Sequence, residues 1–240
     1  MKTDYSNDTA LLEKGLAELG LGETARILPL LVRFMEEIEL FNSAYGLVKV
    51  ADRRELIVKH ILDSLAPLRI IHNLPDKHTQ IARVSSGAWH VADVGSGAGL
   101  PGIPLAVCMP DWEFTLIERM GRRAGFLRDA LAVLGLSNVR VEETEMEKIR
   151  LRSGAGCFDL VVFRAFRPLE PAILKGLLRL VAPGGTLAAY KGRRESVEEE
   201  MAQVLDHAEK GTGPAIGSWE LLPLEVPFLE EERHLVLIKP

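Results

Sequence analysis

Apolar residues in the first third of the chain recur at helical spacing. Two segments, residues 23–41 and 54–71, carry apolar positions that step by three and four, which places them on one face of a helix. The stepping positions are Ile27, Leu31, Phe34, Ile38 and Phe41 in the first segment, and Ile57, Ile61, Leu65 and Leu68 in the second. Pro29 predicts that the first helix either begins near this residue or kinks there.

Beyond residue 88 the pattern changes to short apolar runs that alternate with helical segments. The polar stretch 75–87 separates the two regions and predicts a loop. Strands are predicted at 90–94, 114–118, 139–142, 159–164 and 186–191, and helices at 101–109, 122–134, 169–181 and 196–209. The sequence Ala-Pro-Gly-Gly at 182–185 predicts a stop and a turn. Buried runs separated by helices are typical of a parallel sheet covered on both faces.

The two C-terminal apolar runs, 219–224 and 234–239, have no helix between them. The segment that joins them carries Pro227 and an acidic stretch, so we expect an antiparallel hairpin at the edge of the sheet. Five alternating strands that end in such a hairpin are the layout of the Rossmann-like class I methyltransferase fold, whereas a dinucleotide-binding dehydrogenase usually continues with parallel strands. We therefore predict an α/β fold with a seven-stranded, mostly parallel sheet, an antiparallel edge hairpin and N-terminal helices.

Composition narrows the class of protein. A chain of 240 residues with 47% hydrophobic residues suits one globular domain with a small appended part. Cys108 and Cys157 form no CxxC pair and have no zinc-like His spacing, which favours a cytoplasmic protein without a metal. No signal peptide or membrane span is expected. The net charge of −5 excludes binding of nucleic acid through bulk positive charge, although not through a local basic patch.

A glycine-rich turn joins the first predicted strand to the next helix. Gly95, Gly97 and Gly99 directly follow the run Val91-Ala92-Asp93-Val94. Glycine lets a ligand approach the backbone closely, and unpaired N–H groups at a helix start attract an anionic group. The turn therefore predicts a site for a nucleotide-like ligand.

Two cofactors compete for this turn. The pattern GxGxxG is also satisfied by Gly97, Gly99 and Gly102, with an acid about 20 residues further on, so an NAD-dependent oxidoreductase is an alternative. The strand ends two residues before that pattern begins, and Pro101 and Pro104 crowd the helix start. These features favour S-adenosylmethionine. A glycine turn that binds RNA or protein without chemistry is a third alternative.

Acids near the ends of the second and third strands are candidate cofactor ligands. Glu118 ends the second strand, where a carboxylate can accept hydrogen bonds from both hydroxyls of an adenosyl ribose. Met146 and Glu147 follow the third strand and could meet the ring face and the amino group of adenine. The alternative for Glu118 is a solvated acid at a strand end, and the alternative for Glu147 is an exposed acid on a helix.

Several longer stretches together resemble one family. They are His60-Ile61-Leu62-Asp63-Ser64, residues 93–104 with Gly99-Leu100-Pro101-Gly102-Ile103-Pro104, Arg122-Arg123-Ala124-Gly125-Phe126-Leu127, Arg164-Ala165-Phe166, Lys191-Gly192 and Arg233-His234-Leu235-Val236. On these residues the chain resembles the RsmG family of bacterial small-subunit rRNA methyltransferases, also called glucose-inhibited division protein B. The resemblance runs from about residue 41 to the C-terminus, with departures at Phe41, Gly46, Val48 and Phe163.

The resemblance implies methylation of guanine N7 in the decoding-region loop of 16S rRNA, with S-adenosylmethionine as the methyl donor. By position it implies cofactor contacts at Gly95, Leu100, Met146, Glu147 and Arg164. The implied partner is 16S rRNA or the small ribosomal subunit, without membrane or metal, and we expect a cytoplasmic monomer. The predicted organisation is a helical extension in 1–74 packed on the core, a loop at 75–88 and the methyltransferase domain at 89–240.

Guanine N7 is a lone-pair nucleophile without a proton, so its methylation requires in-line placement rather than acid–base catalysis. We therefore assign no catalytic residue. The chain contains neither a Pro-Cys nucleophile, as cytosine C5 methylation uses, nor the Pro-Pro-Tyr or Pro-Pro-Phe motif of amino-group methylation.

Basic residues gather where the second, fourth and fifth strands end, which is the ligand edge of such a sheet. The predicted RNA-binding residues are Arg122, Arg123, Arg167, Lys191 and Arg193. Arg164 is expected to bind the cofactor carboxylate or an RNA phosphate, because an arginine on guanine N7 would occupy the reacting lone pair. His60 and Asp63 lie three apart on one helix face. We expect them to form a structural hydrogen bond to the glycine turn, with direct catalysis as the alternative.

Overall fold

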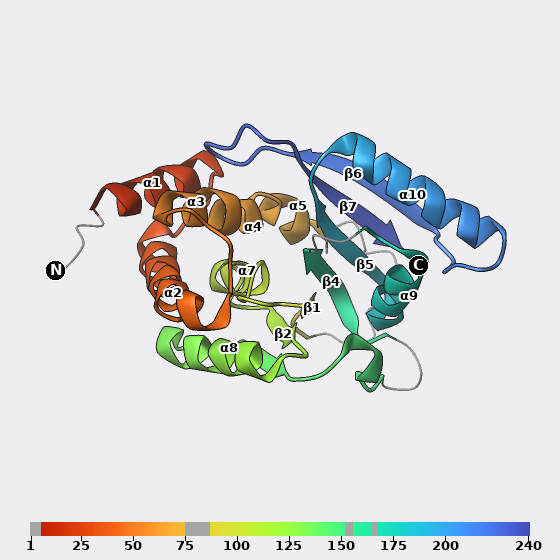
Figure 1. Ribbon diagram of the computed structural model, residues 1–240, viewed down its shortest axis with the longest axis horizontal. Coiled ribbons are helices and arrows are strands. Elements are labelled where there is room, and N and C mark those ends of the chain that lie inside the picture. The colour runs from red at the N-terminus through yellow and green to blue at the C-terminus, as the bar shows by residue number, and fades with distance from the viewer. Residues whose placement is uncertain (1–5, 75–86, 152–155, 165–167) are drawn as a thin grey trace.

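The computed structural model describes residues 6–74, 87–151, 156–164 and 168–240, which fold around one seven-stranded sheet (Figure 1). The strand order is β3-β2-β1-β4-β5-β7-β6. The strands are β1 (His90–Val94), β2 (Glu113–Ile117), β3 (Val139–Glu142), β4 (Phe158–Arg164), β5 (Val181–Lys191), β6 (Ser218–Leu224) and β7 (Arg233–Lys239). β1 to β5 are parallel, whereas β7 runs antiparallel to both β5 and β6. The predicted fold class is confirmed.

Alternate residues of the central strands enter two separate cores. In β4, Leu160 and Val162 belong to one core, and Val161 and Phe163 belong to the other. Successive side chains of a strand point to opposite faces, so a strand that is buried on both faces needs apolar residues at every position. This explains why a central strand such as β4 reads as an almost continuous apolar run in the sequence.

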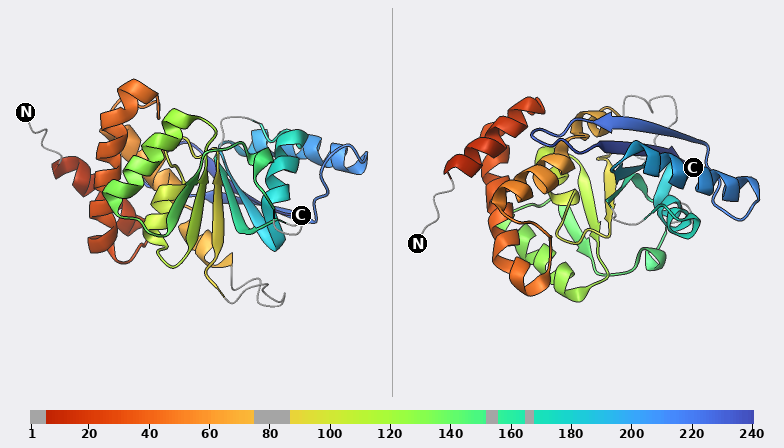
Figure 2. Two further views of the ribbon diagram at one scale, coloured as in Figure 1. Left: turned by 90° about the horizontal axis from the view of Figure 1, so that it is seen from below. Right: turned by 45° about the horizontal axis from the view of Figure 1, so that its top comes forward.

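Helices cover both faces of the sheet, as Figure 2 shows in its left view. On one face, α7 (Gly102–Cys108) and α8 (Gly121–Leu134) lie against the sheet, and the N-terminal helices pack on them and also contact β4, β5 and β7. These N-terminal helices are α1 (Ser6–Glu18), α2 (Thr24–Tyr45), α3 (Arg53–Leu56), η1 (Ile57–Leu62), α4 (Asp63–Leu65) and α5 (Leu68–His72). On the other face lie α9 (Pro171–Leu180) and α10 (Arg194–Glu209), and η2 (Met146–Lys148) follows β3. The N-terminal helices share one core with the sheet.

The N-terminal helices differ from the prediction in three ways. Helix α1 was not predicted, and α2 begins before Pro29, which lies inside it. The single helix expected at 54–71 is wrong, because the chain passes through a π-helical segment, η1, and then breaks before α5. In a π turn the backbone hydrogen bond spans five residues instead of four, so the apolar spacing of an α-helix does not reveal it.

Strand β5 begins at Val181, five residues before the predicted start at 186. The register between β4 and β5 shifts here: Phe158 pairs with Val181, whereas Leu160 pairs with Thr186. The Pro-Gly-Gly sequence therefore forms an irregularity within the strand rather than a turn before it, and Gly184 has a φ of 79°.

The strand order places the ligand site between β1 and β4. The chain leaves β1 for β2 on one side, whereas β4 leads to β5 on the other. Ligands of open α/β sheets bind beyond the carboxyl ends of the strands at such a switch point. The glycine turn follows β1 and Arg164 ends β4, so the fold brings these two predicted features to the same position.

Candidate functional site

The glycine turn after β1 requires glycine for steric reasons. Gly95, Gly97 and Gly99 have φ values of 72°, 56° and 84°, in the left-handed region that other residues rarely adopt. A Cβ at Gly99 would lie 2.5 Å from Cδ1 of Ile103. The turn is thus a compact structure wedged against the start of α7.

Four backbone N–H groups of the turn already donate hydrogen bonds within the protein. Those of Gly95 and Ser96 donate to the carbonyl of Ile117 at 2.9 and 3.2 Å, and those of Gly99 and Leu100 donate to the carbonyl of Ser96 at 2.7 and 3.2 Å. The prediction that unpaired N–H groups here attract an anion is therefore wrong for these four groups. A pyrophosphate needs such free donors, so this arrangement disfavours a dinucleotide.

Glu118 binds the turn through its carboxylate. The side chain follows β2 and is 4% exposed. Oε2 accepts the N–H of Gly97 at 3.0 Å, and Oε1 accepts the N–H of Met120 at 2.8 Å. Each carboxylate oxygen keeps a second lone pair, so the group is held in place and can still accept a hydrogen bond from a ligand.

Asp93, near the end of β1, stabilises the turn through two hydrogen bonds. Its buried Oδ2 accepts the N–H of Gly102 at 3.0 Å, and its backbone carbonyl accepts the hydroxyl of Ser96 at 2.8 Å. Burial raises the pKa of Asp93 to about 7, against the opposing effects of the Gly102 hydrogen bond and the charge of Arg164. The sequence placed Asp93 at the strand end but did not reveal that it binds the first turn of α7.

Met146 and Glu147 lie in η2, beyond β3. The backbone carbonyl of Met146 accepts Nη2 of Arg179 at 2.5 Å. Its side chain points toward α9, because a Cβ at Gly176 would come within 2.7 Å of its Cε atom. Glu147 is exposed. The structure thus places both residues after a parallel strand, with Met146 packed against the second core.

Arg164, at the end of β4, binds the N-terminal helices. Its Nη1 lies 3.2 Å from Oδ2 of Asp63, and Nε of Arg233 lies 3.0 Å from Oδ1 of the same carboxylate. His60 approaches Arg164 through Nδ1 at 3.4 Å. His60 and Asp63 were expected to hydrogen bond to the glycine turn. That expectation is wrong for Asp63, because both carboxylate oxygens bind arginines, and His60 meets Arg164 instead.

The predicted RNA-binding residues have different environments. Lys191 is 8% exposed and its Nζ lies 2.6 Å from Oε2 of Glu200, so its ammonium group is paired within the protein, and its role in RNA binding stays a prediction. Arg123 donates through Nη2 to the carbonyl of Gly46 at 3.4 Å. Arg122 and Arg193 are exposed. Arg167 lies outside the described residues.

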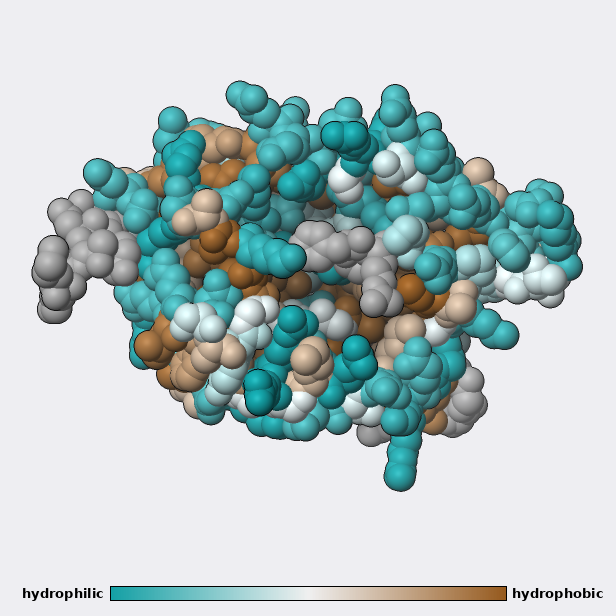
Figure 3. Space-filling view, in the orientation of Figure 1, coloured by the Kyte–Doolittle hydropathy of each residue, from teal (hydrophilic) through white to brown (hydrophobic). Residues whose placement is uncertain are grey.

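In Figure 3 hydrophilic side chains cover most of the face shown, with hydrophobic surface gathered toward its middle.

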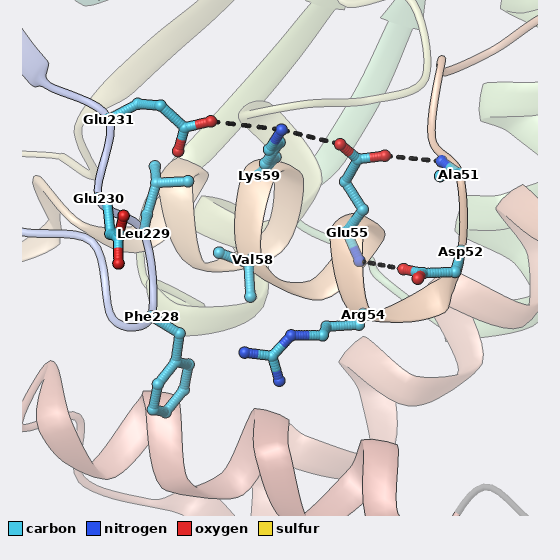
Figure 4. Close-up of a pocket in the computed structure, with 10 residues that line it drawn as sticks. All are labelled: Ala51, Asp52, Arg54, Glu55, Val58, Lys59, Phe228, Leu229, Glu230 and Glu231. Atoms are coloured by element: carbon cyan, nitrogen blue, oxygen red, sulfur yellow. Dashed lines mark hydrogen bonds and ion pairs between the residues drawn. The ribbon is translucent and has the colours of Figure 1, made fainter.

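A pocket of about 640 Å³ lies away from the glycine turn, between residues 51–59 and 228–231 (Figure 4). Its walls are ion-paired: Nζ of Lys59 lies 2.8 Å from Glu55 and 3.4 Å from Glu231. Phe228 lines it from the β6–β7 connection and has a φ of 66°. Four carboxylates and two basic groups line this pocket, so its net charge is negative, in contrast to the arginine-rich sheet edge.

Within the ranges that the structure describes, no cluster of three or more His, Cys, Asp or Glu side chains could hold a metal ion. No helix in the same ranges is long and apolar enough to cross a membrane.

The fold and the glycine turn define a class. The structure is similar to that of a SAM-dependent methyltransferase from Aquifex aeolicus, with a TM-score of 0.51 and 21% identity over 74% of this chain and 91% of the other. It is also similar to a human methyltransferase 10 domain containing protein, with a TM-score of 0.51 and 12% identity over 88% and 97% of the two chains. The chain therefore has the Rossmann-like methyltransferase fold.

The family follows from the sequence comparisons. Residues 27–213 match the family model described as rRNA small subunit methyltransferase G, GidB. The chain is 39% identical to the ribosomal RNA small subunit methyltransferase G of Treponema denticola over 95% of this chain and 93% of the relative. For the protein of the same description from Stenotrophomonas maltophilia the identity is 37%, with the same coverage. The chain belongs to the rRNA small subunit methyltransferase G family.

Proposed function

We propose that this protein transfers a methyl group from S-adenosylmethionine to guanine N7 in the decoding-region loop of 16S rRNA. The observation that carries the proposal is the carboxylate of Glu118. It is bound to a glycine turn in which Gly95, Ser96, Gly99 and Leu100 already donate their N–H groups within the protein. Such a site favours a ligand that donates hydroxyl hydrogen bonds over one that brings a pyrophosphate. Membership of the family supplies the rRNA substrate.

The residues at the switch point fit an adenosyl ligand. Glu118 would accept the ribose hydroxyls through its remaining lone pairs, and Gly95, Gly97, Gly99 and Leu100 would give the ligand close access to the backbone. Met146 and Glu147, beyond β3, would border the adenine, and Arg164 would bind the carboxylate. The bound cofactor supplies an electrophilic methyl group on a sulfonium.

The protein's task in the reaction is to place the guanine. N7 attacks through a lone pair and loses no proton, so no side chain has to act as a base. The buried carboxylates of Asp93 and Glu118 support the turn through Gly102 and Gly97, and neither is needed to move a proton. The rate therefore depends on how precisely the base and the methyl group are aligned.

RNA would bind the exposed arginines at the carboxyl edge of the sheet. Arg122 begins α8 and Arg193 precedes α10, and both are exposed. Arg123 would contribute less directly, because it is bound to Gly46. Phosphate contacts of this kind release counterions, so the affinity for RNA should fall as salt increases.

Labelled methyl transfer tests the proposal. The full chain is incubated with labelled S-adenosylmethionine and either small-subunit particles or free 16S RNA, and N7-methylguanine is mapped by chain cleavage. We expect label at a single guanine in the decoding region. Label elsewhere, or none on either substrate, would refute the proposal. Light scattering on the same sample measures the molar mass of the protein and so tests whether it is the expected monomer.

A further inference from the structure

One buried carboxylate of the N-terminal helices holds two arginines that come from the sheet. The side chain of Asp63 is 8% exposed, and its two oxygens bind different residues: Oδ2 faces Nη1 of Arg164 at 3.2 Å, and Oδ1 faces Nε of Arg233 at 3.0 Å. Arg164 ends β4 and Arg233 begins β7. Two guanidinium groups that are 101 and 170 residues away in the chain thus share one acceptor.

The remaining contacts of Arg164 come from the same helical turn. Nη1 also lies 3.3 Å from Oγ of Ser64 and 3.5 Å from the carbonyl of His60, and Nη2 lies 3.4 Å from Nδ1 of His60. Burial, assisted by the charge of Arg164, lowers the pKa of His60 to about 4, so this ring is neutral at pH 7 and can accept a hydrogen bond. His60 lies in the π-helical segment η1, a local geometry that is frequent at functional sites.

The turn that carries these groups is itself fixed. The hydroxyl of Tyr190, in β5, donates to the carbonyl of Ser64 at 3.0 Å in a buried position. The hydroxyl of Ser64 donates to the carbonyl of His60 at 2.6 Å. Residues 60–64 are therefore tied to the ends of β4 and β5 and to the start of β7, which meet at the switch-point edge of the sheet.

We propose that Asp63 is a positioning residue for methyl transfer, which holds the guanidinium group of Arg164 in the orientation that receives the cofactor. This inference rests on the proposed function. An arginine side chain has many rotamers, and a ligand that binds a free one must order it. The carboxylate of Asp63 removes that cost before the ligand arrives. Arg233 leaves the group of three with a net positive charge, which suits the carboxylate group of the cofactor.

The substitution Asp63→Asn tests this role, because asparagine keeps the size but has one acceptor oxygen and no charge. We expect the dissociation constant for S-adenosylhomocysteine, measured by calorimetry, to rise about tenfold, the effect of losing one charged hydrogen bond. The KM for S-adenosylmethionine should rise with it, whereas kcat at saturating cofactor should change less. An unchanged dissociation constant in a folded variant would overturn the proposal.

Glu39→Gln is the matched control. Glu39 also pairs a carboxylate of the N-terminal helices with a buried arginine, Arg53, but does so away from Arg164. This variant should lower the melting temperature without changing the dissociation constant. If Glu39→Gln weakened cofactor binding as much as Asp63→Asn does, the effect would be one of general stability and the proposal would fail.

A double-mutant cycle shows whether Asp63 acts through Arg164. The variant Arg164→Gln should weaken cofactor binding, and adding Asp63→Asn to it should weaken binding no further. Two fully additive effects would overturn the proposal. If Asp63→Asn does not fold, Ser64→Ala decides in its place, since it removes a single contact of Arg164. A smaller loss of affinity that disappears in the Arg164→Gln background supports the proposal, and no loss overturns it.

Measurements on the wild-type protein distinguish a failure of the proposed function from a failure of the role assigned to Asp63. Failure of the wild-type chain to bind S-adenosylhomocysteine refutes the function itself. Normal binding and methylation by the wild-type chain, together with an unaffected Asp63→Asn variant, refute only the role of Asp63.

Discussion

At the scale of single residues, the carboxylate of Glu118 stabilises the glycine turn and keeps lone pairs that can accept hydrogen bonds from a ligand. Its two oxygens accept the N–H groups of Gly97 and Met120. A glutamine at this position would present an NH₂ group to one of these donors, so one buried N–H would lose its acceptor.

We predict that Glu118→Gln weakens the binding of S-adenosylhomocysteine by about tenfold or more, because a charged acceptor is lost and the turn loosens. Calorimetry measures the change. Glu113→Gln is the control, since Glu113 lies at the other end of β2 and its side chain is 57% exposed. Equal affinities for the two variants would contradict the role assigned to Glu118.

Asp93 predicts a pH dependence of stability. Its pKa is raised from an ordinary 3.8 to about 7 by burial, so between these values the unfolded chain has released a proton that the folded chain still holds. Stability therefore falls as pH rises through this window, and the loss is complete above pH 7. The variant Asp93→Asn has no ionisable group at this position and lacks this dependence.

We expect the free energy of unfolding of Asp93→Asn, relative to wild type, to improve by about 2–3 kcal/mol from pH 5 to pH 8, at ~1.4 kcal/mol per pKa unit. Denaturant titrations at the two pH values measure it. A difference between variant and wild type that is independent of pH would show that Asp93 titrates normally.

Local pattern predicted the residues of the turn but not their long-range partners. Gly95 and Glu118 could be identified because each directly follows an apolar run that ends at the ligand edge. The environments of Arg164 and Lys191 could not be predicted in this way. Their carboxylate partners, Asp63 and Glu200, come from helices that only the folded chain brings to the strand ends.

At the scale of elements, the contact of α7 with β1 and β2 depends on a missing side chain. A Cβ at Gly102 would lie 2.5 Å from Cδ2 of Leu116 and 2.6 Å from Oδ2 of Asp93. Any larger residue must push α7 away from the carboxylate that binds its first turn. Gly125, inside α8, meets nothing within 4 Å.

We predict that Gly102→Ala destabilises the protein by about 1–3 kcal/mol through overpacking. The matched substitution Gly125→Ala should stabilise it by about 0.5–1 kcal/mol, because alanine is the better helix former. Thermal unfolding of the two variants and of the wild type measures both the expected decrease and the expected increase in stability. A tolerated Gly102→Ala would mean that α7 does not lie as closely on the sheet as described.

Helices and strands could be predicted from the sequence where a local apolar pattern alone determines them. The central parallel strands β1, β2 and β4 are short and largely buried, so their bounds could be placed within a residue. Helix α1 was missed because its contribution to the core includes only two fully buried leucines, Leu12 and Leu16, too few to reveal a period. The break in the helix at 54–71 lies at Pro67, a local signal that apolar spacing does not include. The π-helical segment η1 is not revealed by that spacing either.

At the scale of the whole molecule, an acidic chain has to bind RNA through a limited surface. The net charge is −5, and the exposed arginines Arg122 and Arg193 lie at the edge of the sheet where β2 and β5 end. The far end of α10 carries a cation that serves as a control: Lys210 lies beyond the last turn of that helix and pairs with Asp206.

We predict that Arg122→Glu weakens the binding of a 16S rRNA fragment and lowers the slope of log affinity against log salt by about 0.7 or more for the lost phosphate contact. Lys210→Glu makes the same change of charge and should leave the slope unchanged. Filter binding between about 50 and 200 mM salt measures both. Equal effects of the two variants would indicate attraction by total charge instead of a local surface.

The glycine turn, with Glu118 bound to it, is the proposed binding site of the methyl donor. Calorimetry of the full chain with S-adenosylhomocysteine and with NAD, each titrated separately, distinguishes the two cofactors. We expect saturable binding of S-adenosylhomocysteine at one site per chain, and no measurable heat from NAD at the same concentrations. Saturable binding of NAD without binding of S-adenosylhomocysteine would refute the assignment of this site.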